Sequence, residues 1–131
     1  MFLDASAIVA MMTNESDAAS LSARLAAARS PTTSAMALWE ASVACSRIFR
    51  LEPNAALREV EAYIRLFDVQ IIAIEPAIAA AAVDAYHRFG KGRHPAGLNF
   101  GDCFAYACAR QLDMPLLHKG DDFPQTDIET A

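Results

Sequence analysis

The sequence predicts an α/β fold: a three-layer sandwich in which a short, mainly parallel sheet of four or five strands lies between helices. Short apolar runs alternate along the chain with longer segments whose apolar residues recur at helical spacing. That alternation is typical of a parallel sheet covered by helices on both faces. The first run, Phe2–Leu3, ends at Asp4. Because ligands of such sheets bind just beyond the carboxyl ends of the strands, Asp4 lies where a functional site is expected.

The composition indicates one globular domain that spans residues 1–131. Hydrophobic residues make up 54% of the chain and charged residues 21%, which is typical of a folded protein. No apolar run approaches the roughly 20 residues that cross a bilayer, and Asp4 interrupts a start that lacks the basic segment of a secretion signal. We therefore expect a cytoplasmic protein with no membrane partner. The three cysteines, at spacings that match no zinc site, are interpreted as reduced core residues.

The net charge of −5 bears on the class of partner. It argues against a protein that coats nucleic acid by bulk electrostatic attraction. A cluster of carboxylates that binds a divalent cation would also give a negative formal charge, and the bound cation would reverse that charge locally. Nucleic acid therefore remains open as a substrate.

The first half of the chain predicts a short strand and three helices after Phe2–Leu3. Thr13–Asn14 offers an N-cap for a helix from about Glu15 to Ala28, and Ser30–Pro31 ends it. A very short strand is expected at residues 31–33. Ser34 then caps a helix whose core face is Leu38, Ala41, Cys45 and Ile48, and Pro53 begins another whose apolar face is Leu57, Val60, Ile64 and Phe67.

The second half begins with the clearest strand, Val69–Ile74, which is rich in β-branched residues. Glu75–Pro76 opens a helix whose core face is Ile78, Ala82, Ala85 and Phe89. A loop at residues 90–97 holds three of the five glycines and leads to a helix that Asn99 caps and that runs from Gly101 to about Leu112. A strand at Leu116–His118 and a last short strand around Thr126–Glu129 complete the predicted sheet.

Carboxylates stand at four places near predicted strand ends or helix starts: Asp4, Glu40, Asp102 and the pair Asp121–Asp122. Strand ends and the helix starts that follow them share one rim of a parallel sheet, so these side chains can converge. Like charges that close together repel unless a cation lies between them. Oxygen ligands without His or Cys at ligand spacing indicate Mg²⁺, or Mn²⁺ as a substitute. The chemistry implied is phosphodiester hydrolysis by metal-activated water.

Four segments that carry these acids resemble the signature segments of PIN-domain ribonucleases. They are Phe2–Ala7, the helix with Glu40, Phe100–Ala107 and Leu116–Phe123, and the likeness is greatest to VapC-type toxins of bacterial toxin–antitoxin pairs. The resemblance covers nearly the whole chain, in order. It implies a Mg²⁺-dependent endoribonuclease that cleaves single-stranded RNA, forms a homodimer and is inhibited by a VapB-type antitoxin.

The resemblance also implies roles for individual residues. Asp4 and Asp102 would be the main metal ligands, Glu40 would complete the site and hold the metal or its water, and Ser6 and Asn99 would support it. Many family members carry a Thr-x-Asp-x-Asp-Phe pattern, whereas this chain has His118–Phe123 with glycine at the first aspartate position. Asp121 is the favoured fourth acid, and Asp122 is the alternative.

Basic side chains are expected to contact RNA, and apolar surface is expected to contact the antitoxin. Four basic side chains are predicted to border the groove and contact RNA phosphates, namely Arg88, Lys91, Arg93 and Lys119. His94 and His118 are expected to be non-catalytic. An antitoxin arm is expected across apolar surface near Met11, Met12 and the helices that begin at residues 34 and 53.

Three other classes of protein fit the sequence less well than a nuclease. A phosphatase of the haloacid-dehalogenase type requires a second aspartate two residues after Asp4, where this chain has Ser6, and a receiver domain requires an aspartate after the third strand. A catalytically weak PIN scaffold that acts as a protein-binding module would predict a broken acidic set. Asp4, Glu40 and Asp102 are all present, which favours the enzyme.

Overall fold

Four parallel strands form one sheet at the centre of the computed structural model, which describes residues 1–131. The strands are β1 (Phe2–Leu3), β2 (Thr32–Ser34), β3 (Gln70–Ile72) and β4 (Leu116–Leu117), in the order β3-β2-β1-β4. All three pairings are parallel, with Phe2 opposite Thr32 and Leu116. The predicted α/β sandwich with a short parallel sheet is confirmed.

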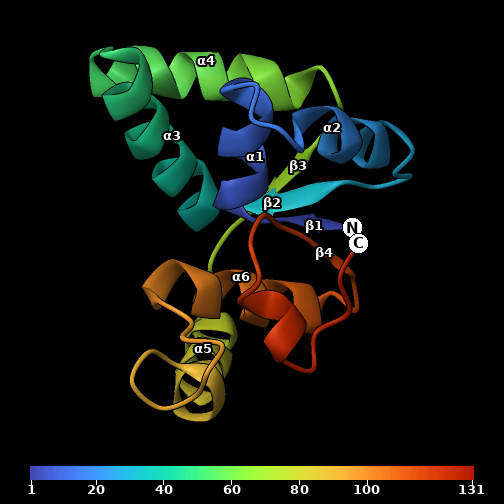
Figure 1. Cartoon of the computed structure of the whole chain (residues 1–131), viewed down its shortest axis with the longest axis vertical. Helices are drawn as coiled ribbons and strands as arrows, with labels where there is room; N and C mark the ends of the chain where they lie inside the picture. The colour runs from blue at the N-terminus through green and yellow to red at the C-terminus, as the bar shows by residue number, and fades with distance from the viewer.

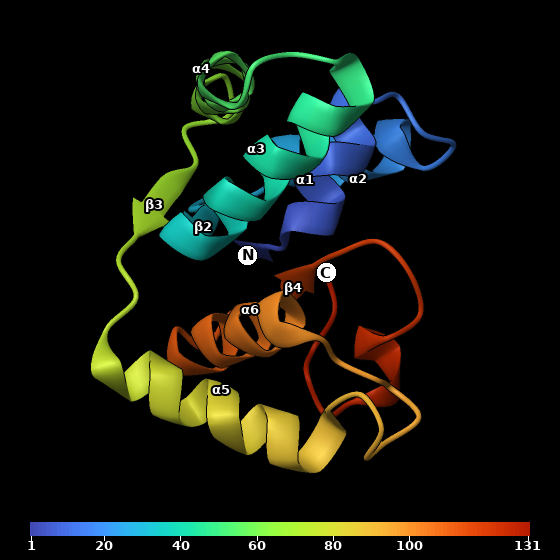
Figure 2. The same cartoon turned by 90° about the vertical axis from the view of Figure 1, so that its left-hand side faces the viewer.

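Six helices cover the two faces of this sheet. They are α1 (Ala5–Met12), α2 (Ala18–Ala26), α3 (Ala35–Phe49), α4 (Pro53–Arg65), α5 (Pro76–Phe89) and α6 (Phe100–Gln111). α1 to α4 form the layer on one side of the sheet, and α5 and α6 form the layer on the other (Figures 1 and 2). None of these helices is both long and apolar enough to span a membrane.

The strands have two cores to fill because successive side chains of a strand point to opposite faces. Phe2 and Leu116 pack with α5 and α6, whereas Leu3 and Leu117 pack with α1 to α4. All four side chains are fully buried. This explains why β1 and β4 are continuous apolar runs without polar alternation, and it places the strand ends between the two helix layers.

The predicted caps and core stripes of the later helices are largely confirmed. Ser34 accepts a hydrogen bond from the Ala37 amide at 3.1 Å, and proline begins both α4 and α5. The predicted face of α5 is buried throughout. Ile48, predicted to lie in the core, is 53% exposed because the last turn of α3 extends away from the sheet (Figure 1). The three cysteines are buried and form no disulfide.

The start of the chain differs from the prediction. One helix was expected over residues 15–28, but the structure has α1 directly after Asp4 and then α2 over Ala18–Ala26. α1 forms because Asp4 caps it, with Oδ2 accepting from the Ser6 amide at 2.9 Å. Thr13 ends this helix, and its hydroxyl donates to the Val9 carbonyl at 2.8 Å.

The end of the chain also differs. In place of a strand around Thr126–Glu129, a 3₁₀ turn, η1 (Phe123–Gln125), precedes an isolated bridge between Thr130 and Leu116. The Asp127 carboxylate accepts hydrogen bonds from Arg88 on α5 and Tyr106 on α6. These contacts hold residues 123–128 against the helices, and pairing with β4 begins only at Glu129, whose carbonyl accepts from the Leu116 amide at 2.8 Å.

Candidate active site

Asp4 stands at the end of β1 and is buried, with 4% of its surface exposed. Its amide donates to the Leu117 carbonyl at 2.9 Å, which fixes it between β1 and β4. Its Oδ2 atom accepts from the Ser6 amide at 2.9 Å and from the Ser6 hydroxyl at 2.5 Å. Oδ2 of Asp4 therefore caps α1, while Oδ1 of Asp4 makes no hydrogen bond within the protein.

Glu40 reaches the same region from the second turn of α3. Its carboxylate lies directly over Gly101 in the first turn of α6, so closely that a Cβ at position 101 would overlap all three carboxylate atoms. An alanine here would push the flexible end of the Glu40 side chain aside, so the glycine lets the carboxylate lie over the first turn of α6. The sequence does not predict this role of Gly101, because it depends on how α3 packs on α6.

Asp102 is held by a reciprocal capping box with Asn99, as the sequence predicts. The Asn99 amide donates to Asp102 Oδ2 at 2.8 Å, and the Asp102 amide donates to Asn99 Oδ1 at 3.1 Å. Asn99 therefore orients Asp102 and leaves Oδ1 without a hydrogen-bond partner in the protein.

The electrostatics show that these three acids share one site. Burial, together with the charges of Asp4 and Asp102, raises the pKa of Glu40 to about 7. Burial and the charges of Asp4 and Asp122 raise the pKa of Asp102 to about 6, against the opposing effect of the Asn99 hydrogen bond. Carboxyl groups with raised pKa values in a cleft are typical of functional sites.

The two candidates for the fourth acid, Asp121 and Asp122, differ in the group that their charge affects. The charge of Asp122 acts on Asp102, whereas the charge of Asp121 acts on His118. Of the pair, Asp122 is the one whose charge is among the causes that raise the pKa of Asp102. The sequence favours Asp121 instead. Gly120, directly before the pair, has a positive φ of +93°, and the directions of the two side chains after such a turn cannot be predicted from the sequence.

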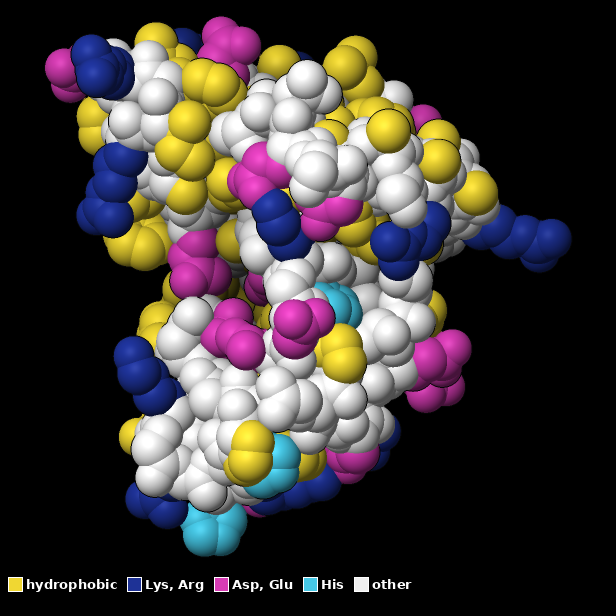
Figure 3. Space-filling model, viewed as in Figure 1, with side chains coloured by type: hydrophobic (Ala, Val, Ile, Leu, Met, Phe, Trp, Pro, Cys, Tyr) yellow, Lys and Arg dark blue, Asp and Glu magenta, His cyan; other side chains and the backbone are white.

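Acidic side chains border a hollow between the α1–α4 layer and the α5–α6 layer (Figure 3). No three His, Cys, Asp or Glu side chains converge closely enough to form a preformed metal cage. The donor set nevertheless fits Mg²⁺, which keeps several of its waters and is commonly held by one or two carboxylates. The oxygens without hydrogen bonds on Asp4 and Asp102 are suited to such a hydrated ion.

The four predicted phosphate contacts fall into two groups. Arg88 is hydrogen-bonded to Tyr106 and Asp127, and the Lys119 ammonium pairs with Glu15 and Asp17. Lys91 and Arg93 are exposed on the loop at residues 90–97, where the Arg93 guanidinium lies 5.4 Å from the centre of the Tyr86 ring. Only the loop pair is free to meet a ligand.

The rings of His94 and His118 pack against phenylalanines. The His94 ring lies edge-on to Phe89 at 5.2 Å, and its Nδ1 accepts from the Ala96 amide at 3.1 Å. His118 packs on Phe123 at 5.1 Å, and burial lowers the pKa of its imidazole.

Residues 1–129 match the PIN domain family. The chain belongs to the PIN domain family. It is 40% identical to Ribonuclease VapC30 of Mycobacterium tuberculosis over 131 residues, which cover all of this chain and 98% of the relative. It is 41% identical to Ribonuclease VapC of Mycolicibacterium smegmatis over 128 residues, which cover 98% of this chain and 97% of that protein.

Two solved structures share the PIN fold. One is the crystal structure of Mycobacterium tuberculosis VapC20, described as a Sarcin-Ricin loop cleaving toxin, with a TM-score of 0.76, 17% identity, and coverage of 99% of this chain and 97% of that chain. The other is a toxin–antitoxin complex from Klebsiella pneumoniae, with a TM-score of 0.68 and 17% identity over 96% of this chain and 92% of that chain. The resemblance of the signature segments to the PIN domain is thus confirmed.

Proposed function

We propose that this PIN domain is a Mg²⁺-dependent endoribonuclease, the toxin of a toxin–antitoxin pair. The observation that carries the proposal is the gathering of Asp4, Glu40 and Asp102 from three separate segments, with two of their pKa values raised towards neutrality. Full-length similarity to proteins named VapC ribonucleases supports the choice of RNA as substrate.

In this proposal, Asp4 and Asp102 hold the metal, and Mn²⁺ can replace Mg²⁺. The bound metal would supply an activated water and stabilise charge on a phosphoryl oxygen. Glu40 orients the attacking water and can exchange a proton near neutral pH, because its pKa is about 7. Ser6 and Asn99 fix the two metal-binding carboxylates through the hydrogen bonds described above.

We assign the fourth acidic position to Asp122, with Asp121 as the weaker candidate. Asp122 is the one whose charge acts on Asp102. Asp122→Asn should therefore reduce cleavage more than Asp121→Asn. Both reductions should be smaller than that of Asp4→Asn, since Asp122 lies on a loop and can act through water.

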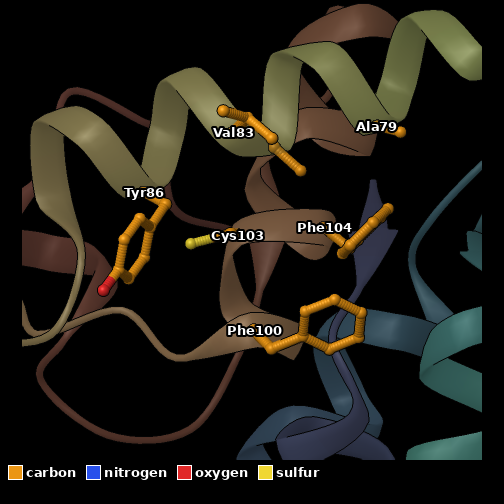
Figure 4. Close-up of a pocket in the computed structure, with 7 residues that line it drawn as sticks. Ala79, Val83, Tyr86, Phe100, Cys103 and Phe104 are labelled. Atoms are coloured by element: carbon orange, nitrogen blue, oxygen red, sulfur yellow. The ribbon is translucent and has the colours of Figure 1, made fainter.

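The antitoxin would approach over exposed aromatic residues beside the acids. Trp39 is 62% exposed and precedes Glu40, and Phe100 is 66% exposed and precedes Gly101. An apolar pocket of about 390 Å³ opens next to Phe100 between α5 and α6, where Tyr86, Val83 and Phe104 line it (Figure 4). Apolar side chains of a polypeptide suit this lining, because a nucleobase would leave its polar edges unpaired there.

This location replaces part of the surface expected from the sequence. Met11 belongs to the core and is 7% exposed, so it cannot form an antitoxin contact. A protein partner is also consistent with the fold shared with the Klebsiella pneumoniae toxin–antitoxin complex. We further expect a homodimer, which light scattering of the purified protein would test.

The function is tested by incubating labelled total RNA with purified protein in Mg²⁺ or in EDTA. Wild-type protein should give defined fragments in Mg²⁺ alone, Asp4→Asn should give none, and Asp84→Asn, an exposed acid on α5, should match wild type. Absence of cleavage by protein that binds Mg²⁺ and carries no antitoxin would contradict the enzyme. It would favour the protein-binding scaffold.

A further inference from the structure

Lys119 lies in the loop at residues 118–122, which follows the last strand and carries Asp121 and Asp122; this loop is called the acidic loop. β4 ends at Leu117, and Asp121 and Asp122 follow Lys119 by two and three residues. The Lys119 side chain extends to the connection between α1 and α2, where Nζ pairs with Glu15 and lies 3.7 Å from Asp17 Oδ1. The three side chains are 34%, 37% and 38% exposed, so solvent screens their interaction less than it screens an ion pair on the open surface.

The carboxylates that Lys119 contacts have few other partners. Asp17 Oδ1 is buried without a hydrogen bond, and Lys119 is the one cation within ion-pair distance of it. Glu15 accepts a hydrogen bond from the Thr13 hydroxyl at 3.1 Å, at the end of α1. The Lys119 ammonium therefore connects the acidic loop to Glu15, which is hydrogen-bonded to Thr13 at the end of α1.

The backbone of Lys119 is tied to the same helix. Its amide donates to Ser6 Oγ at 3.0 Å, and that hydroxyl donates to Asp4 Oδ2 at 2.5 Å. On the other side, Gly120 turns the chain towards Asp122, whose charge acts on Asp102. Lys119 thus stands between two members of the acidic site, connected to Asp4 through Ser6 and to Asp122 through the chain.

We propose that Lys119 is a positioning residue of the acidic site. Its ion pairs with Glu15 and Asp17 hold the loop at residues 118–122 against α1, which keeps the Lys119 amide on Ser6 and the Ser6 hydroxyl on Asp4. The assignment rests on the proposed function. It replaces the contact with RNA phosphates that the sequence suggests for this lysine, since the ammonium is already paired.

Lys119→Met tests the proposal because it keeps the length of the side chain and removes the charge. We expect Mn²⁺ binding, followed by the spin-resonance signal of free Mn²⁺, to weaken about tenfold, as is usual when a residue behind a metal ligand is lost. At fixed Mg²⁺, kcat should fall by a similar factor, while KM for RNA should stay within about twofold. Glu15→Gln combined with Asp17→Asn should give the same changes, and adding Lys119→Met to that pair should change little more.

Two further variants serve as controls. Lys119→Arg keeps the cation and should restore most of the Mn²⁺ binding and kcat. Arg58→Met removes one exposed cation from α4 and should change neither quantity. A phosphate contact would give the opposite pattern: KM would rise in Lys119→Met with kcat and Mn²⁺ binding unchanged, and the Glu15/Asp17 variant would cleave normally. That result would overturn the proposal.

Amide hydrogen exchange of residues 119–122 needs neither metal nor RNA. It should be faster in Lys119→Met and in the Glu15/Asp17 variant than in wild type or Arg58→Met. Unchanged exchange in both would overturn the proposal. If exchange rises as expected but wild-type protein binds no Mn²⁺ and cleaves no RNA, the tether is confirmed and the proposed function is what fails.

Discussion

Gly101 and Ser6 illustrate how single residues shape the acidic site. Gly101 leaves the space that the Glu40 carboxylate fills, and Ser6 directs a hydroxyl to Asp4. Neither side chain carries charge, yet each decides where a carboxylate lies. The acidic residues could be found from the sequence by their type, but the space over Gly101 could not, because it depends on how α3 packs on α6.

Gly101→Ala provides a test in which two effects have opposite sign. An alanine in a helix normally stabilises a protein by up to about 1 kcal/mol relative to glycine. Here its Cβ would push the flexible end of the Glu40 side chain aside, so we expect less stabilisation than the helix alone would give. Urea denaturation measures this change. Gly101→Ala should stabilise the protein more in the Glu40→Ala background than in wild type, and equal changes in the two backgrounds would contradict the close packing.

The raised pKa values of Glu40 and Asp102 predict how stability depends on pH without metal. Their ordinary values are 4.5 and 3.8, and the folded values are about 7 and about 6. Between these limits the folded protein binds more protons than the unfolded chain, so the free energy of unfolding falls as pH rises.

We therefore expect wild-type protein in EDTA to lose stability between about pH 5 and about pH 8 more steeply than Glu40→Gln, which cannot ionise. Urea denaturation across that range measures both slopes. Equal slopes for the two proteins would show that Glu40 titrates as an ordinary surface carboxyl.

Among the secondary-structure elements, α1 and the C-terminal segment differ from the sequence prediction. Residues Ala7–Ala10 are apolar enough to be taken for strand or loop next to Phe2–Leu3, and only the hydrogen bond from the Ser6 amide to Asp4 shows that a helix begins there. A last short strand was expected around Thr126–Glu129, but the Asp127 carboxylate is bound by α5 and α6, and only the bridge at Thr130 pairs with Leu116. Both errors arise from side-chain contacts that local pattern does not reveal.

Asp127→Asn tests the clamp on the C-terminal segment. Its carboxylate lies 2.6 Å from Arg88 Nη2 and 2.5 Å from the Tyr106 hydroxyl. Because the Arg88 and Asp127 side chains are 40% and 46% exposed, we expect a modest loss, about 0.5–1 kcal/mol in the free energy of unfolding. Amide exchange over residues 128–131 should also become faster. Asp84→Asn removes a more distant carboxylate of the same arginine, at 3.9 Å, and an effect as large as that of Asp127→Asn would contradict the clamp.

At the scale of the whole molecule, the parallel sheet explains why acids far apart in the sequence meet. β1 ends at Asp4, and β2 leads directly into α3 and thus to Glu40. The same rim receives the start of α6 and the loop after β4. This convergence could be predicted from the alternation of strands and helices, whereas the choice between Asp121 and Asp122 depended on the turn at Gly120.

The charge distribution of the molecule predicts weak, salt-sensitive RNA binding. The chain carries a net charge of −5. Of the four basic residues predicted to contact RNA phosphates, only Lys91 and Arg93 form no ion pair with an acidic side chain. Replacing both by glutamine should raise KM and lower the slope of log affinity against log salt by about 1.4, or 0.7 for each lost phosphate contact on a single strand. Arg58→Gln should leave that slope unchanged, and an unaltered slope in the double variant would place RNA elsewhere.

Calorimetric titration of Mg²⁺ into the RNA-free protein shows whether carboxylates from separate segments form one divalent-cation site. Performed near pH 6.5 in two buffers of different ionisation enthalpy, it reports both binding and proton release. The structure predicts saturable binding that releases protons, because Glu40 and Asp102 are partly protonated there. Asp102→Asn should weaken binding strongly, and Glu40→Gln should reduce the proton release. Binding that is absent from wild type, or identical in wild type and both variants, would contradict such a site.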